Sequence, residues 1–139
     1  MTSFQSAAGA QGRQFAQQAD FLLQQGGFDL GKPVLLRDVG VEIDREAVSP
    51  RGRTVWFEYK GSIQGVRPGL IRTDTLKKAI ANGALLNALP NHPPYVVLTS
   101  HLPTTGAALA MLAAARQLGY FDDVICIYDP VQAERLREL

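Results

Sequence analysis

The run Thr54–Lys60 (TVWFEYK) constrains the fold of this chain most strongly. Its β-branched and aromatic residues are typical of a β-strand, in which successive side chains point to opposite faces. Side chains two positions apart then share a face, so Trp56, Glu58 and Lys60 lie together. A carboxylate and an ammonium placed among apolar residues in mid-strand cost free energy unless a site uses them. The run therefore predicts both a sheet and a functional site on one of its faces.

A second carboxylate, Asp44, precedes this strand in the run Val39–Ala47 (VGVEIDREA). The alternation of apolar and polar residues predicts a strand here too, with Glu42 and Asp44 on the same face. If the two strands are neighbours, Asp44 and Glu58 point to one face and can both reach the same ligand. The pattern thus brings two acidic side chains from separate strands to a single site.

Two strand-borne carboxylates suit a hard divalent cation. Mg²⁺ prefers oxygen ligands and keeps several waters, so one or two carboxylates suffice from the protein. We expect Asp44 and Glu58 to be metal ligands, with the backbone carbonyl of Tyr59 or its neighbour completing the set. Lys60 projects to the same side, where its ammonium would position the attacking water or stabilise developing charge. These residue types predict a Mg²⁺- or Mn²⁺-dependent phosphodiesterase centre.

Composition describes an ordinary globular protein. With 139 residues, 46% apolar and 19% charged, the chain predicts a single domain spanning residues 1–139. One cysteine, Cys126, excludes a disulfide framework and a cysteine-based zinc cluster, and its apolar run favours a place in the core. The first residues lack the order of a signal peptide, and no apolar run reaches membrane-spanning length. We therefore expect a cytoplasmic protein without a membrane partner.

Periodicity predicts the order helix, two or three strands, helix, strand, helix, strand, helix. Late strands separated by helices imply parallel crossovers with helices on both faces of the sheet. Paired glycines, Gly26 and Gly27, end the first helix. The expected helices are Gly12–Gln25, Thr73–Leu89, Gly106–Gly119 and Val131–Leu139, and the expected strands are Val34–Asp38, Val39–Ala47, Thr54–Lys60, Tyr95–Ser100 and Val124–Asp129.

Basic residues are concentrated around the suspected site. Positions 51 to 78 hold seven basic and two acidic residues, a net +5, while the rest carries −4 because the whole chain is +1. Such a zone suits a polyanionic substrate. Arginine binds phosphate through its fork of donors, and glycines in the loop permit close approach to a ligand. The residues expected to contact DNA are Gln64, Arg67, Arg72 and Lys77.

The succession of a helix, an Asp on a strand, a Glu-x-Lys on the next strand, then a helix and a strand resembles the PD-(D/E)XK nuclease superfamily. Locally, EID followed by WFEYKGS is similar to the corresponding strands of its small resolvase-like and endonuclease-like members, as are Gly12-x-x-Phe15 and Gly27-Phe28. The resemblance covers about residues 12 to 100. It implies a restriction-endonuclease-like α/β fold, a three-layer α/β/α core with a mixed sheet flanked by helices.

The resemblance also implies roles for the site residues. Asp44 and Glu58 become metal ligands, Lys60 becomes the catalytic lysine, and DNA becomes the substrate. By analogy with enzymes of this size, a homodimer would supply the second active site for cutting both strands. Many relatives carry a Glu on the first helix, where Ala16 stands here. Either two carboxylates suffice, or Asp20 or Glu42 supplies a third.

Two other functions compete with a metal-dependent DNA endonuclease acting in repair, recombination, restriction or phage DNA processing. The missing first-helix carboxylate would also suit a non-catalytic nucleic-acid-binding protein that retains the nuclease fold. A Rossmann-like nucleotide-binding protein would use the strand-to-helix segment Ser100–Met111 (SHLPTTGAALAM). This segment lacks both the G-x-G-x-x-G fingerprint and the phosphate-binding G-K-[ST], which disfavours the nucleotide-binding alternative.

Overall fold

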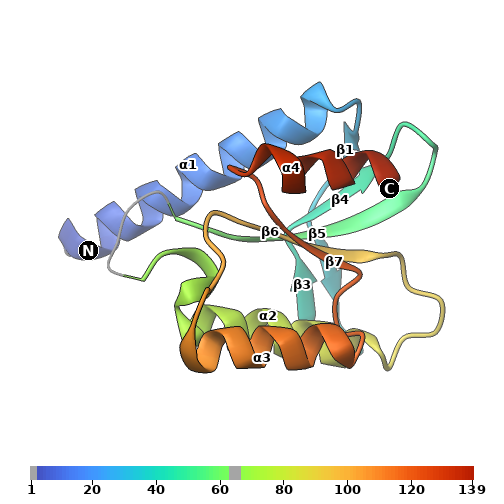
Figure 1. The fold of residues 1–139 in the computed structure, drawn as a ribbon. Coiled ribbons are helices and arrows are strands. Elements are labelled where there is room, and N and C mark those ends of the chain that lie inside the picture. Colours follow the sequence, from blue (N-terminus) through green and yellow to red (C-terminus); the bar gives the residue numbers. More distant parts are fainter. Residues whose placement is uncertain (1–2, 63–66) are drawn as a thin grey trace.

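A computed structural model describes the backbone of residues 3–62 and 67–139 and the side chains of this part from residue 12 onwards. The chain is an α/β protein in which four helices pack against a five-stranded mixed sheet (Figure 1). The elements are α1 Ser3–Gln25, β1 Asp29–Leu30, β2 Val34–Leu36, β3 Val41–Ile43, β4 Arg45–Val48, β5 Thr54–Lys60, the 3₁₀ turn η1 Gly69–Ile71, α2 Thr73–Leu86, β6 Tyr95–Thr99, α3 Gly106–Gln117, β7 Asp123–Cys126, α4 Pro130–Ala133 and the 3₁₀ helix η2 Glu134–Glu138.

The strand order of the main sheet is β1-β4-β5-β6-β7. β4 is antiparallel to β1 and β5, whereas β5, β6 and β7 are parallel, as the helices between them predicted. β2 and β3 form a separate antiparallel pair. In the register of the central strands, Arg45 lies opposite Phe57 and Lys60 opposite Thr99. The Glu-x-Lys strand is therefore at the centre of the sheet.

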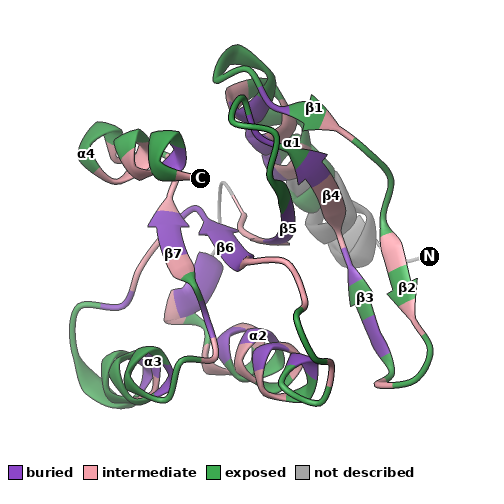
Figure 2. Cartoon of the chain, turned by 90° about the vertical axis from the view of Figure 1, so that its right-hand side faces the viewer, coloured by how far each residue is buried: buried purple, intermediate pink, exposed green. Residues whose placement is uncertain are grey.

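Each face of the sheet has its own hydrophobic core. Helices α2 and α3 and the β2–β3 pair cover one face, where Trp56 and Tyr95 are buried. Helix α1 and the C-terminal segment α4–η2 cover the other face, where Phe57 and Leu98 are buried. Figure 2 shows the buried strands β5 and β6 between these layers. The predicted α/β/α layering and the alternation along β5 are both confirmed.

Several element boundaries differ from the prediction. Helix α1 begins at Ser3 rather than Gly12, because the alanine- and glutamine-rich leader favours helix. β1 was missed because it has two residues and no periodicity. Asp44 does not lie in mid-strand, since the chain bends there between β3 and β4. Arg72 occupies the N-cap of α2 and makes no side-chain capping bond.

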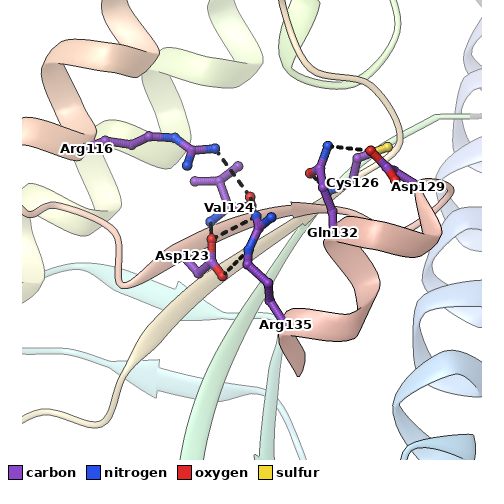
Figure 3. Close-up of polar contacts among 7 residues, drawn as sticks. All are labelled: Arg116, Asp123, Val124, Cys126, Asp129, Gln132 and Arg135. Atoms are coloured by element: carbon purple, nitrogen blue, oxygen red, sulfur yellow. Dashed lines mark hydrogen bonds and ion pairs between the residues drawn. The ribbon is translucent and has the colours of Figure 1, made fainter. Parts of the chain in front are cut away.

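The outer edge of β7 is closed by side chains (Figure 3). Edge strands normally expose unpaired backbone groups that invite another strand. Here the carbonyl of Val124 accepts from Arg116 at 3.3 Å and from Arg135 at 3.0 Å. The N–H of Cys126 donates to Gln132 at 2.8 Å. The C-terminal segment therefore protects this edge from pairing with another chain.

In the part of the chain that the structure describes, no helix combines the length and the apolar character needed to cross a bilayer.

Candidate active site

Asp44 marks the point where the sheet divides. The β4–β5 ladder ends at the pair Arg45–Phe57, and the preceding residues leave the main sheet to join β2. Beyond this end, the Asp44 carboxylate takes over as acceptor: its Oδ2 accepts the backbone N–H of Tyr59 at 2.8 Å. This bond ties Asp44 to the edge of β5. The sequence predicted the proximity of Asp44 to β5 correctly, although a bend rather than a strand provides it.

Glu58 is a carboxylate buried inside the α2 face of the sheet, with 1% of its surface exposed. Its Oε2 accepts two hydrogen bonds, one from the Asn82 amide at 2.8 Å and one from the Tyr95 hydroxyl at 3.1 Å. Both donors are neutral. Glu58 forms no ion pair with any residue in the described ranges 12–62 and 67–139. A buried carboxylate without a cationic partner is costly in its ionised form.

The surroundings of Glu58 raise its pKa from 4.5 to about 8. Burial is the largest cause, because it penalises the charged form. The neighbouring Asp44 carboxyl raises the pKa further, through a hydrogen bond and through like charge. Lys60 and Asn82 act in the opposite direction, since an ammonium and an amide donor both favour the carboxylate. Asp44 and Glu58 therefore form a close acidic pair that favours a bound proton or cation.

Lys60 and the backbone of Tyr59 complete this arrangement. Lys60 ends β5 on the same face as Glu58, is half-buried, and is near enough for its charge to lower the pKa of Glu58. The carbonyl of Tyr59 lies beyond the last β4–β5 pair, on the strand edge where its N–H meets Asp44. Asp44, Glu58 and this carbonyl are all oxygen donors. The set therefore fits Mg²⁺ or Mn²⁺ better than a softer metal.

Neither candidate for a third carboxylate joins the site. Asp20, on α1, accepts from Arg45 Nη2 at 2.7 Å and from the Tyr59 hydroxyl at 2.6 Å, on the opposite face of the sheet. Glu42 is exposed on β3, between two residues buried in the core. Among the described side chains, no group of three or more His, Cys, Asp or Glu is placed to hold a metal ion. Neither Asp20 nor Glu42 therefore supplies a third carboxylate, and whether two carboxylates suffice stays a prediction.

The expected DNA-contacting residues lie on the segment that enters α2. Arg67, Arg72 and Lys77 are all exposed, and Gln64 lies outside the described residues. This segment is fixed to the end of β6: the Leu70 N–H donates to the His101 carbonyl at 3.0 Å. A methyl group on Gly69 would come within 2.8 Å of the His101 nitrogen. The close contact holds the basic segment at the strand ends where Lys60 also lies.

The same contact bears on the nucleotide-binding alternative. Gly69 has φ +59° and packs against Thr99, Ser100 and His101, the end of the strand that would hold a nucleotide. The Thr105 cap of α3 makes no side-chain capping bond. This end of β6 is therefore covered by η1, which disfavours a nucleotide there.

Sequence reasoning missed Asn82 and Tyr95, the two side chains that hold Glu58. A signal for Asn82 exists, since it is a lone polar residue beside Ala79, Gly83 and Leu86 on the buried side of α2. Tyr95 opens an apolar strand and has no distinguishing pattern. The bonds join residues 24 and 37 positions apart, so spacing could not predict them.

A cavity of about 720 Å³ lies elsewhere, on the α1 face of the sheet. Its lining includes Leu22, Phe28, Ile127 and Leu136, and neither Asp44 nor Glu58 contributes to it. The walls of this cavity are mainly apolar, whereas the Glu58 site holds a buried ionisable pair. Comparisons with protein-family models, with curated proteins and with solved structures find no match. The geometry of the site is therefore the evidence for assigning it.

Proposed function

We propose that this protein is a metal-dependent DNA endonuclease that hydrolyses phosphodiester bonds. The observation that carries the proposal is the buried Glu58 carboxylate, paired with Asp44 and held by neutral donors. Perturbed ionisable groups of this kind cluster at functional sites. The order of elements around them supports a PD-(D/E)XK-like assignment, with a leading helix, Asp44 at a strand end, Glu58 and Lys60 on the next strand, and then a helix and a strand.

The chain's own residues would divide the work. Bound Mg²⁺ or Mn²⁺ would neutralise the phosphate and lower the pKa of a water. Asp44, Glu58 and the carbonyl of Tyr59 would hold that ion. Lys60, on the same face as Glu58, would orient the attacking water and stabilise negative charge on the phosphate in the transition state. The half-buried position of Lys60 restricts its motion and strengthens this electrostatic effect.

The exposed basic segment supports DNA as the substrate. Arg67, Arg72 and Lys77 would contact the phosphate backbone without reading sequence, and Gln64 is proposed with them. Cutting both strands would require a second active site, which a homodimer would supply. A cytoplasmic location stays a prediction from the sequence.

The proposal is tested by nicking of supercoiled plasmid in Mg²⁺ or Mn²⁺. Glu58→Ala and Lys60→Ala should each lower the nicking rate by about 10²-fold or more, since each removes a group that acts on the transition state. Asp38→Ala and Lys32→Ala are matched controls, because both residues are exposed and belong to neither the site nor the basic segment. Equal nicking by Glu58→Ala and wild type would exclude the proposed centre.

A non-catalytic nucleic-acid-binding protein is the second candidate. The observation that favours it is the number of carboxylates at the site. Asp44 and Glu58 are two, whereas many nucleases of this type carry a third carboxylate on the first helix. Salt-sensitive DNA binding without metal-dependent cleavage, together with no Mn²⁺ binding by calorimetry, would establish this alternative.

A further inference from the structure

The two hydrogen bonds to Glu58 converge on a single oxygen. Asn82, from α2, and Tyr95, from β6, both donate to Oε2. Oε1 accepts no hydrogen bond from an N–H or hydroxyl in residues 12–62 and 67–139. In Asp44, too, one carboxylate oxygen is held: Oδ2 accepts the hydrogen bond from the Tyr59 N–H. Each carboxylate therefore has one oxygen held by an N–H or hydroxyl donor, and the two carboxyls also contact each other, where a proton or a cation could be shared.

The two hydrogen bonds to Oε2 fix the orientation of the Glu58 side chain. A carboxylate bound through one oxygen by donors from two different elements cannot rotate without breaking both bonds. The Tyr95 ring is itself immobilised: its backbone N–H donates to Asp122 at 2.6 Å, and it stacks on Phe121 with centroids 6.1 Å apart. The donors therefore hold Glu58 through Oε2 and leave Oε1 without an N–H or hydroxyl donor among the described residues.

We infer that Asn82 and Tyr95 are positioning residues, which orient the Glu58 carboxylate so that Oε1 can coordinate a divalent cation together with Asp44. The inference rests on the proposed function. Groups that hydrogen-bond a ligating side chain in this way typically contribute 10- to 100-fold to metal affinity. Neither residue touches the metal or the DNA. Their effect acts through the geometry of Glu58.

The placement of Asn82 supports a positioning role. It lies on the buried side of α2, whose exposed side carries Lys77 in the basic segment. The same rigid helix therefore carries a group expected to bind DNA and a group that holds the metal ligand. An apolar residue would fill this partly buried position at lower cost if Glu58 were not there, because Asn82 loses part of its hydration.

The experiment measures Mn²⁺ binding by calorimetry for Asn82→Leu, Tyr95→Phe and the double variant, all checked for folding by circular dichroism. We expect each single variant to raise the Kd for Mn²⁺ about 10-fold or more. Because both donors hold one oxygen, the double variant should lose more affinity than the two single changes together. Asn87→Leu is the matched control, since Asn87 is exposed at the end of α2, and it should leave the Kd unchanged.

Two further readouts separate positioning from a general structural effect. Excess Mn²⁺ should restore part of the nicking by Asn82→Leu, and DNA affinity measured in Ca²⁺ should stay at the wild-type value. If wild type binds Mn²⁺ in a way that Glu58→Gln abolishes, while Asn82→Leu and Tyr95→Phe bind equally well, the positioning role is wrong and the nuclease centre stands. If wild type shows no Glu58-dependent Mn²⁺ binding, both are wrong.

Discussion

Strand β5 carries a tyrosine and a glutamate on opposite faces, and the two faces treat a carboxylate in different ways. On the α1 face, Asp20 meets a cation: the Arg45 guanidinium binds both its oxygens, at 3.1 and 2.7 Å, and the Tyr59 hydroxyl adds a third bond. On the α2 face, Glu58 meets the neutral donors Asn82 and Tyr95. The Asp20 pair is one-quarter exposed, whereas Glu58 is almost fully buried.

The difference indicates separate roles for the two sites. A carboxylate already neutralised by a bidentate arginine has its charge compensated within the fold, and joins α1 to the sheet. A carboxylate buried more deeply, beside a second carboxylate, keeps a demand for positive charge that its hydrogen-bond donors do not meet. The first arrangement is typical of a structural ion pair, and the second agrees with the proposed role of Glu58 as a metal ligand.

The largest expected effect is the pH dependence of stability in the metal-free protein. Glu58 keeps its proton in the folded state up to about pH 8, while its ordinary pKa is 4.5. The folded state therefore binds more protons between these values, so the free energy of unfolding should fall as pH rises from 4.5 to 8. At 1.36 kcal/mol per unit, the total is on the order of 5 kcal/mol.

Urea unfolding at a series of pH values measures this slope. Glu58→Gln should remove it and should be more stable than wild type above pH 8, because the amide carries no charge to bury. Asp38→Asn, at an exposed turn, should keep the wild-type slope. Parallel pH curves for wild type and Glu58→Gln would mean that Glu58 is not held in its neutral form.

Removal of Asp20 should have the next largest effect. It should lower the free energy of unfolding, whereas Glu58→Gln should raise it above pH 8. Asp20→Ala leaves Arg45 without its carboxylate and Tyr59 without its acceptor, which should cost about 2–3 kcal/mol of unfolding free energy. The fall between pH 4.5 and 8 should persist, since Glu58 is on the other face. Denaturant unfolding at pH 7 measures the loss, and an Asp20→Ala protein as stable as wild type would show that this ion pair contributes nothing.

The smallest effects come from two matched tyrosine hydroxyls, one on each face. Tyr59→Phe removes the bond to Asp20 and Tyr95→Phe removes a bond to Glu58, and each should lower the unfolding free energy by about 1 kcal/mol. Calorimetry should then separate them, because weaker Mn²⁺ binding is expected for Tyr95→Phe alone. Equal losses of Mn²⁺ affinity would remove the distinction between the faces.

Much of the fold could be predicted from local sequence. The span of β5, the parallel order of β5, β6 and β7, and the helices between them follow from periodicity. Alternation along β5 also predicted the face shared by Trp56, Glu58 and Lys60. The errors lie where local signals are weak: the start of α1 in an alanine-rich leader, the two-residue strand β1, and the bend at Asp44.

The sequence by itself determined which residues occupy each face of β5, because strand geometry is fixed by the backbone of neighbouring residues. Tertiary structure alone decided how each charge is compensated. Asp20 contacts Arg45 and Tyr59 on the α1 face, and Glu58 contacts Asn82 and Tyr95 on the α2 face, through bonds between residues 24 to 39 positions apart. Such partners depend on how helices pack on the sheet, which no local pattern encodes, and they distinguish a carboxylate paired with an arginine from one held by neutral donors.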